Sequence, residues 1–194
     1  MDKLNSEEIT SLLQSQISPP FRVNVFDTID STNQYLKKLP STNQIEICCA
    51  EQQTQGRGRF GRHWHSPFGE NIYCSIRWPY DQELTKLSGL SLITSLAVRS
   101  MLYQLNPNLE IAIKWPNDLL WKDKKLCGSL IEMVSEPRKP TQIIFGIGLN
   151  VNTNTKMHPL SDRPWCSIYE ITNTLYNRNH LIAQMICSLK SYFD

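Results

Sequence analysis

The apolar residues of the chain follow two spacings, one typical of β-strands and one typical of α-helices. Short runs rich in β-branched and aromatic residues predict strands, whereas apolar positions three and four residues apart predict helices. The predicted strands cover residues 21–26, 45–50, 71–78, 110–115 and 142–151. The predicted helices cover residues 5–16, 30–39, Glu83 to about Leu105, and about Asn179 to Tyr192.

A hairpin is also predicted at residues 118–134, with its turn at Lys122 to Lys124 although this turn contains no glycine. The run at 142–151 is almost continuously apolar, which is typical of a central strand. Strands outnumber helices and several follow one another through short turns. The pattern therefore favours an α+β fold, a mixed sheet flanked by helices, over a regular βαβ series. We expect a helical extension at residues 1–20 and one domain at residues 21–194.

Composition narrows the class of protein without identifying it. The 194 residues are 40% apolar and 20% charged, as in an ordered globular domain, and the net charge is only +2. A positive field that attracts anions would therefore have to be local. The chain lacks a long apolar stretch and begins with a polar segment, so we expect neither a membrane span nor a signal peptide. Six cysteines, none spaced as C-x-x-C, favour buried free thiols in a reducing cytoplasm.

The segment GRGRFG at residues 56–61 has the G-x-G-x-x-G spacing of a dinucleotide-binding loop. Such a loop must follow a strand and open a helix. The strand at 45–50 precedes it, but Pro67 and Gly69 interrupt residues 62–70 before the strand pattern returns. The dinucleotide interpretation therefore fails.

Arginines give this loop a different chemistry. It contains no acidic residue from Gln52 to Gly69, but it contains Arg57, Arg59, Arg62, His63 and His65. The glycines let the backbone approach a ligand, and guanidinium groups bind carboxylates or phosphates through paired hydrogen bonds. A nucleic-acid-binding loop and a plain solvated turn share this composition and stay open as alternatives. The two histidines could bind a metal ion, but the sequence places no third ligand near them.

A second group of candidate residues lies at positions 113–132. The strand at 110–115 runs through Lys114 into Pro116, Asn117 and Asp118, which offer a cation, a rigid turn, an amide and an acid. Asp118 could hold Mg²⁺ together with a nucleotide phosphate, or it could cap a turn.

Lys125 opens the next apolar strand, and Gly128 within that strand indicates a close approach by another group. The two groups of residues together favour chemistry on a carboxylate and a nucleotide.

The motifs resemble, in the same order, those of the catalytic domain of bacterial biotin protein ligases. They are DSTNQYL, QTQGRGRFGRHWHSPFGENIY, KWPNDL, KLCGSLIE and GIGLNV, and the resemblance covers about residues 21–190. It implies a largely antiparallel sheet like that of class II aminoacyl-tRNA synthetases. It also implies two reactions, in which biotin and MgATP first give biotinyl-5′-AMP. A lysine of a biotin carboxyl carrier protein domain then takes the biotinyl group.

The resemblance implies roles for individual residues. Arg59 and Lys125 would be catalytic and would face the carboxylate and phosphate, and Asp118 would contact Mg²⁺. The biotin site would comprise Ser31, Thr32, Asn33, Gln53, Gly56, Arg57, Arg59, Lys125 and Gly128. The nucleotide site would comprise Arg62, Trp64, Lys114, Asn117 and Asn150, and Gly148 would be a close-approach position.

Partners and domain organisation follow from the same resemblance. The expected partner is the carrier domain of acetyl-CoA carboxylase or of a related biotin-dependent carboxylase, and a homodimer is compatible with the family. We expect no DNA or membrane binding. We also expect no helix-turn-helix domain before Phe21 and no C-terminal β-barrel domain, although ligases of this family usually carry such a barrel.

Two other functions stay open. One is a non-catalytic module that binds biotin or its adenylate. The other is a lipoate ligase or octanoyl transferase of the same fold, some of which use a cysteine nucleophile. Cys127 lies between Lys125 and Gly128, but the GRGRFGR and KWPND motifs favour the biotin branch and a packed thiol.

Overall fold

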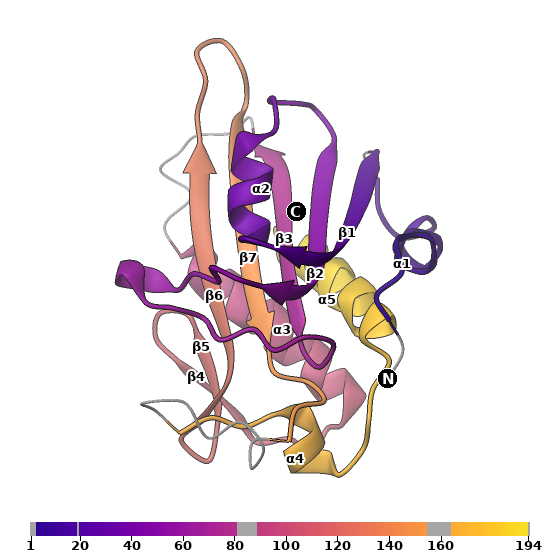
Figure 1. Ribbon diagram of the computed structural model, residues 1–194, viewed down its shortest axis with the longest axis vertical. Helices are drawn as coiled ribbons and strands as arrows, with labels where there is room; N and C mark the ends of the chain where they lie inside the picture. Colours follow the sequence, from indigo (N-terminus) through magenta and orange to yellow (C-terminus); the bar gives the residue numbers. More distant parts are fainter. Residues whose placement is uncertain (1–2, 19, 81–88, 155–163, 194) are drawn as a thin grey trace.

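A mixed sheet of seven strands forms the centre of the part of the chain that this computed structural model describes, residues 3–18, 20–80, 89–154 and 164–193 (Figure 1). The strands are β1 (Phe21–Ile29), β2 (Ile45–Gln53), β3 (Ile72–Tyr80), β4 (Ile111–Lys114), β5 (Asp118–Trp121), β6 (Lys124–Val134) and β7 (Thr141–Leu149). Their order is β1-β2-β3-β7-β6-β5-β4. β1 and β2 are parallel and every other neighbouring pair is antiparallel. The predicted fold class and the central position of the 142–151 strand are confirmed.

The helices of the described residues also match the sequence pattern, with one exception. They are α1 (Ser6–Leu13), α2 (Thr32–Lys38), α3 (Leu90–Leu105), α4 (Ile168–Thr172) and α5 (Arg178–Phe193). Asn5 caps α1 by accepting a hydrogen bond from the N–H of Glu8. The predicted 83–105 helix is described from Leu90 onward, and residues 83–88 lie outside the described part. The pattern missed α4, because its five residues are too few to show a helical repeat.

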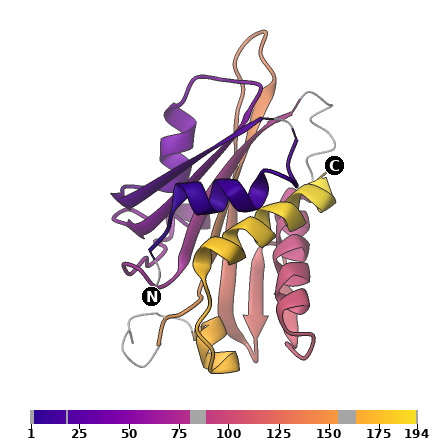
Figure 2. The same cartoon turned by 90° about the vertical axis from the view of Figure 1, so that its right-hand side faces the viewer.

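Two layers cover the sheet. α1, α3 and α5 lie on one face, whereas α2 and the loop between β2 and β3 (residues 54–71, here the arginine loop) lie on the other (Figures 1 and 2). The main core, which includes Phe145 and Met101, fills the space under the first layer. A smaller cluster of Leu36, Cys48 and Ile144 lies under α2. Successive strand residues therefore alternate between the main core and the face that carries α2 and the arginine loop.

The hairpin between β5 and β6 turns at Lys122 and Asp123, as predicted. Both residues have positive φ, 46° and 63°. Two consecutive left-handed residues make a type I′ turn, for which Asp is one of the few tolerated residues besides Asn and Gly. The tight turn returns the chain so that Asp118 pairs with Gly128 across the two strands.

Arg77, a buried residue of β3, anchors the C-terminal end of α2. Its guanidinium donates to the carbonyl oxygens of Leu36, Leu39 and Pro40 at 2.8, 2.8 and 2.6 Å, and to Gln142 Oε1 at 3.1 Å. The last carbonyls of a helix have no partner within the helix, so the arginine satisfies them from the sheet. The C-terminal end of α2 is thereby attached to the sheet.

A buried ion pair attaches the N-terminal segment and α5 to the sheet. Glu51 Oε2 accepts from Arg178 Nη1 at 2.6 Å, and both side chains are almost completely buried. Glu51 Oε1 accepts from the backbone N–H of Leu4 at 2.6 Å. Arg178 also donates to the carbonyl of Asn71 at the end of the arginine loop. One carboxylate therefore joins three segments that are distant in the sequence.

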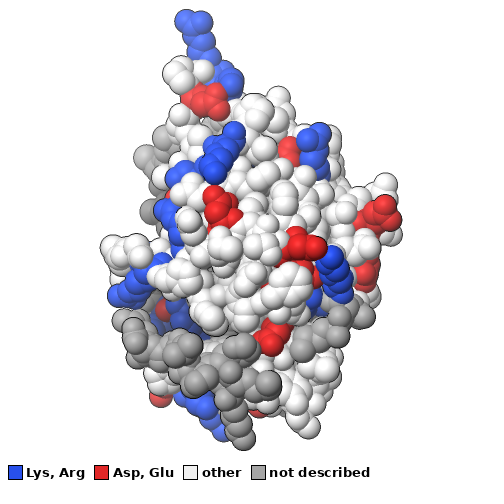
Figure 3. Space-filling view, in the orientation of Figure 1, with Lys and Arg blue, Asp and Glu red and all other residues white. Residues whose placement is uncertain are grey.

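Charges of both signs are interspersed on the face shown in Figure 3, and no single-sign field covers it. This distribution agrees with the near-zero net charge. Among the helices of the described residues, none has the length and apolar character needed to cross a membrane.

Arg178→Met should lower the free energy of unfolding by about 3–5 kcal/mol, because it leaves the Glu51 carboxylate buried without its cation. Urea unfolding followed by circular dichroism measures this loss. Lys3→Met is the matched control, because the Lys3–Asp27 pair is 63% and 62% exposed, and it should leave the midpoint unchanged. Equal midpoints for the two variants would show that the buried pair does not stabilise the fold.

Candidate active site

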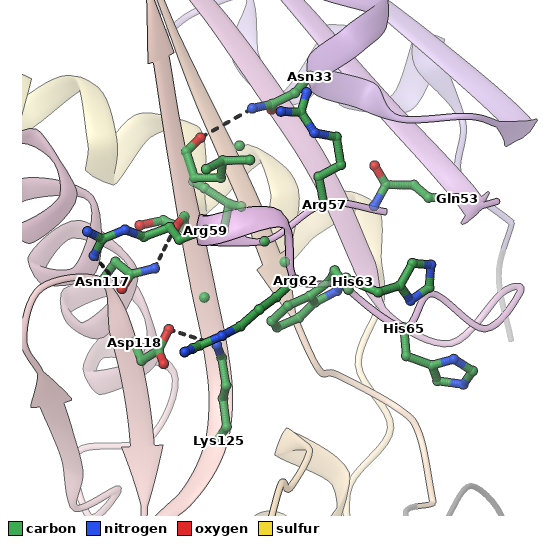
Figure 4. A pocket seen from close by; sticks show the side chains of 18 of the residues that line it. Asn33, Gln53, Arg57, Arg59, Arg62, His63, His65, Asn117, Asp118 and Lys125 are labelled. Atoms are coloured by element: carbon green, nitrogen blue, oxygen red, sulfur yellow. Dashed lines mark hydrogen bonds and ion pairs between the residues drawn. The ribbon is translucent and has the colours of Figure 1, made fainter. Parts of the chain in front are cut away.

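A cavity of about 880 Å³ opens on the face of the sheet that carries α2 and the arginine loop. Its walls come from the start of α2, the end of β2, the arginine loop, the β4–β5 turn, β6 and β7 (Figure 4). All but one of the residues predicted to bind ligands line it. They are Ser31, Thr32, Asn33, Gln53, Arg57, Arg59, Arg62, Trp64, Lys114, Asn117, Asp118, Lys125, Gly128 and Asn150.

Gly56 is the exception, and it lies behind the wall of the cavity. A Cβ at this position would stand 2.4 Å from the carbonyl oxygen of Trp64 and 2.9 Å from Ser66 Oγ. The absence of a side chain at Gly56 therefore serves the packing of the arginine loop against itself.

Uncharged polar residues line one end of the cavity, here the head end, which comprises Ser31, Thr32 and Gln53, with the buried Ser75 behind them. Gln53 Oε1 accepts from the backbone N–H of Thr32 at 3.0 Å and from its hydroxyl at 3.1 Å. The buried Ser75 hydroxyl lies 2.7 Å from Thr32 Oγ1. Ser31 occupies the N-cap position of α2, but its hydroxyl makes no capping hydrogen bond. The head end is suited to a ligand group that both donates and accepts hydrogen bonds.

Asn33 lines the cavity, but its amide bonds to the protein. Nδ2 donates to Glu132 Oε2 at 2.9 Å and to the carbonyl of Leu130 at 3.3 Å. Oδ1 lies 2.6 Å from the hydroxyl of Ser75. Asn33 is therefore a brace between α2 and the strands β3 and β6.

The arginine loop is a compact turn. The N–H of Gly58 donates to the carbonyl of Arg62 at 2.6 Å, and the N–H of Trp64 donates to the carbonyl of Gly56 at 2.9 Å. The helical residues between these bonds form only a 3₁₀ turn, η1 (Arg59–Gly61). β2 and β3 on either side are antiparallel, so the loop opens no crossover helix and the exclusion of a dinucleotide fold is confirmed.

Two cations are already held across the cavity by protein acceptors (Figure 4). Arg59 Nη1 donates to Asn117 Oδ1 at 3.2 Å, and Asn117 Nδ2 donates in turn to the carbonyl of Ser129 at 2.7 Å. Lys125 Nζ lies 2.8 Å from Asp118 Oδ1 and 5.2 Å from the centre of the Trp64 ring. The motif from Asn117 to Asp118 thus orients the two residues predicted to be catalytic.

The charge of the cavity wall is strongly positive. Among the residues that the structure describes, the lining contains the cations Arg57, Arg59, Arg62, Lys114 and Lys125, and a single carboxylate, Asp118. A concave wall of one sign concentrates ligands of the opposite sign. The local positive field that the sequence required is therefore present in this cavity.

Glycines on β6 and β7 form the floor. A Cβ at Gly148 would stand 2.4 Å from the indole of Trp64, and one at Gly128 would stand 3.0 Å from the same ring. A Cβ at Gly146 would stand 2.3 Å from Asn33 Oδ1. The prediction of close approach at Gly128 and Gly148 is confirmed: Trp64 of the arginine loop approaches both, and the Lys125 side chain also approaches Gly128.

Asn150 and the segment after it form the far end of the cavity. Asn150 Nδ2 donates to the carbonyls of Lys125 and Cys166 at 3.3 and 3.0 Å. The N–H of Lys125 donates to the carbonyl of Pro164, which places Trp165 on the cavity wall. The sequence analysis missed two lining residues: Trp165, which belongs to no motif, and Asn71, which a motif contains but to which the resemblance gave no role.

Cys127 lies on the opposite side of the sheet from the cavity. It belongs to the main core, and burial raises the pKa of its thiol to about 12. All six cysteines are free thiols, five of them buried and Cys187 half-buried. Within the described ranges, no group of three or more His, Cys, Asp or Glu residues could hold a metal ion.

Comparison with known proteins gives consistent results. Residues 25–150 match the model of the biotin/lipoate A/B protein ligase family. The chain is 36% identical over 192 residues to the bifunctional ligase/repressor BirA of Salmonella typhimurium, which covers 98% of this chain and 58% of that protein. The chain thus spans a little over half the length of this relative.

Two solved structures have the same fold. Biotin protein ligase from Aquifex aeolicus, in complex with biotin and ATP, matches 88% of this chain and 69% of that chain, with a TM-score of 0.73 and 27% identity. Biotin protein ligase from Leishmania major, in complex with biotinyl-5-AMP, matches 89% of this chain and 74% of that chain, with a TM-score of 0.71 and 27% identity.

Gly148→Ala should displace the Trp64 indole, because the added methyl group would stand 2.4 Å from it. We expect a changed near-ultraviolet circular dichroism spectrum and stronger quenching of tryptophan fluorescence by iodide. Gly58→Ala is the matched control, because its methyl group would be no closer than 3.4 Å to any atom. A Gly148→Ala protein with the parental spectrum and quenching would contradict the packing of Trp64 on the floor.

Proposed function

This chain belongs to the biotin/lipoate A/B protein ligase family, and we propose that it carries the catalytic domain of an ATP-dependent biotin protein ligase. The observation that carries the proposal is one cavity that joins an uncharged polar head end to a floor flanked by Arg59 and Lys125. Biotin has the same layout, a polar ureido head and a carboxylate at the end of an apolar chain. The relatives solved with biotin and ATP, and with biotinyl-5-AMP, support this assignment.

In the first reaction, an oxygen of the biotin carboxylate attacks the α-phosphorus of ATP. The bond from this phosphorus to the β-phosphate bridging oxygen breaks, and pyrophosphate leaves with the electron pair. The two reactants are anions that repel each other. Arg59 and Lys125 offset this repulsion and stabilise the charge that develops on the phosphate, and each well-placed donor contributes about 3–4 kcal/mol in comparable sites.

In the second reaction, the amine of an acceptor lysine attacks the acyl carbon of biotinyl-5′-AMP. The acyl carbon–oxygen bond breaks, AMP leaves, and the amine loses a proton as the amide forms. No enzyme nucleophile takes part, so the chief contribution of the site is to hold the adenylate in position and to exclude water. In this proposal Arg57 and Arg62 would cover the ligand on the solvent side, whereas Trp64 of the same loop packs on the floor glycines.

Asp118 is the residue that would contact Mg²⁺. A Mg²⁺ ion that arrives with nucleotide phosphates needs only one or two protein carboxylates, and Asp118 is the carboxylate of the described cavity lining. The ion would neutralise phosphate charge. Lys114, Asn117 and Asn150 supply the polar groups around the nucleotide in this proposal.

The head end favours biotin over lipoate. The dithiolane ring of lipoate has no strong hydrogen-bonding group, so it would leave the Ser31 hydroxyl, which makes no capping hydrogen bond, without a ligand partner. A site built from polar groups rejects a ligand that leaves them unpaired. The structural likeness to lipoate-binding LipL1 of Plasmodium falciparum, at 10% identity, concerns the fold alone.

The proposal extends to organisation, partner and location. We assign residues 21–194 to the catalytic domain and residues 1–20 to a helical extension, which α1 and the Leu4–Glu51 hydrogen bond attach to it. The acceptor would be the biotin carboxyl carrier domain of a biotin-dependent carboxylase. Free cysteines agree with a reducing cytoplasm.

The direct test is mass spectrometry of the protein mixed with biotin, MgATP and a carrier domain. We expect biotinyl-AMP and a carrier that gains one biotinyl group. Biotin binding in a calorimeter without either product would instead identify a non-catalytic binding module.

Arg59→Gly should release biotinyl-AMP faster and label bystander lysines. A hydrogen bond to a charged group contributes about 1.5–3 kcal/mol, so we expect release to be roughly ten- to hundredfold faster. Arg138→Gly is the matched control, because Arg138 lies in the β6–β7 turn away from the cavity lining and already has a glycine-like φ of 62°. Rapid filtration measures retention, and unchanged retention in Arg59→Gly would refute its assigned role.

Cys127→Ala should keep most of its turnover, because the thiol is on the core side of the sheet and its pKa of about 12 keeps it protonated near neutral pH. Steady-state biotinylation measures this, with Cys187→Ala as the matched control. A collapse of turnover in Cys127→Ala alone would support acyl-enzyme chemistry in place of adenylation.

A further inference from the structure

Glu132 is a partly buried acid on the cavity side of β6 to which neither the motifs nor the family assign a role. It pairs across the sheet with Ile144, whose side chain packs under α2. Its side chain is 14% exposed. A carboxylate buried to this degree requires partners, because burial without them is costly.

Three donors from two separate segments bind this one carboxylate. Oε2 accepts from Asn33 Nδ2 at 2.9 Å. Oε1 accepts from Lys37 Nζ at 3.0 Å and from Arg57 Nη2 at 3.4 Å. Asn33 and Lys37 belong to α2, whereas Arg57 belongs to the arginine loop. Glu132 on β6 thus connects α2 with the arginine loop, the two segments that cover this face of the sheet.

The carboxylate is negatively charged at neutral pH. Burial raises the pKa of Glu132, but hydrogen bonds from Asn33 and Lys37 and the charge of Arg57 lower it further than burial raises it, so the pKa lies below its ordinary value. The negative charge is what the three donors share. Glutamine would keep the shape of the side chain and remove that charge.

The contact at Arg57 restrains the whole arginine loop. The Gly58–Arg62 and Trp64–Gly56 backbone hydrogen bonds make residues 56–64 one unit. A restraint on Arg57 therefore also limits the positions of Arg59 and Trp64. The Arg59–Asn117 hydrogen bond provides a second attachment of the same unit on the other side of η1.

The contact at Asn33 restrains the head end. Thr32, which precedes it, donates its backbone N–H and its hydroxyl to Gln53 and accepts from Ser75. Asn33 Nδ2 has two acceptors on β6, the carbonyl of Leu130 and the charged carboxylate of Glu132. These two hydrogen bonds fix the orientation of the amide in which Oδ1 faces Ser75. The same carboxylate therefore orients the start of α2.

We infer that Glu132 is a positioning residue of the active site. It holds the arginine loop closed through Arg57 and fixes the position of the head end through Asn33. The choice of biotin as ligand rests on the proposed function, whereas the effect on the loop rests on geometry alone. Glu132 touches no ligand in this account. Its role is to reduce the open conformations from which a ligand escapes.

Glu132→Gln tests the inference with two measurements. In ligand-free protein, trypsin should cleave after Arg59 and Arg62 faster than in the parent, while cleavage outside the loop stays at the parental rate. In calorimetry, the Kd for biotin should rise about tenfold, the size expected for a weakened charge-assisted hydrogen bond. A general loss of stability would accelerate cleavage at all sites alike, so the site-specific ratio separates positioning from a merely structural role.

Lys37→Met is the matched control, because it removes the other cation from the same carboxylate without touching the loop. It should leave loop cleavage unchanged and the biotin Kd within about twofold. Arg57→Met combined with Glu132→Gln should cleave after Arg59 and Arg62 no faster than either single variant, because both act on one contact.

The outcomes separate the two proposals. A parent protein that binds no biotin would refute the proposed function, and the loop cleavage would still test Glu132. Glu132→Gln with parental cleavage and parental biotin affinity would refute the inference. Effects that add in the double variant would refute action through Arg57. If Glu132→Gln does not fold, Glu132→Asp shortens the side chain by one methylene and carries the same expectation for loop cleavage.

Discussion

The glycines at positions 128, 146 and 148 allow α2 and the arginine loop to approach the sheet closely, and the cavity depends on that approach. Gly146 makes room for Asn33, and Gly148 and Gly128 make room for the Trp64 ring. All three lie on β6 and β7, next to each other in the middle of the sheet. A methyl group at 146 or 148 would overlap α2 or the loop, so the cations carried by the loop would move away from Lys125. The charged groups of the loop can therefore lie near Lys125 only because these three positions carry no side chain.

Burial divides the arginines into structural and functional groups. Arg77 and Arg178 are almost completely buried, and each binds several acceptors of the protein. Arg57 is 39% exposed and faces the cavity. A buried guanidinium without acceptors would be costly, so the first group is held by fixed carbonyl and carboxylate partners. The second group keeps donors that a ligand can use.

The fold could be predicted from local patterns to a large extent. The strands, the hairpin at Lys122 and Asp123, and the central strand at 142–151 each follow from residues adjacent in the sequence. The arginine loop could be singled out from the sequence because three glycines and three arginines lie within seven positions, 56–62, and all three arginines line the cavity. The hydrogen bonds that join distant segments around the site could not be predicted in this way. Glu132 is 99 positions from Asn33 and 75 from Arg57, and only the completed sheet brings them together.

The resemblance to a family identified residues but not what their atoms do. Asn33 and Asn150 were both expected at ligand sites and both line the cavity, yet their amides join segments of the protein. An asparagine in a motif has the same sequence signature whether it binds a ligand or a carbonyl of the protein. The same limit applies to Trp165, which reaches the cavity through a backbone hydrogen bond between Lys125 and Pro164 that no local pattern encodes.

The two cations that we propose as catalytic differ in how readily they can turn to a ligand. Arg59 is bound to the neutral amide oxygen of Asn117, which an anionic phosphate or carboxylate outcompetes. Lys125 is bound to the charged Asp118, so a ligand must share it or Asp118 must take another cation. On the proposed function, Mg²⁺ that accompanies the nucleotide is such a cation, and Asp118 would then release Lys125 toward the forming acyl phosphate. Both donors would then face the ligands once these are bound, so little reorganisation would be required at the moment of reaction.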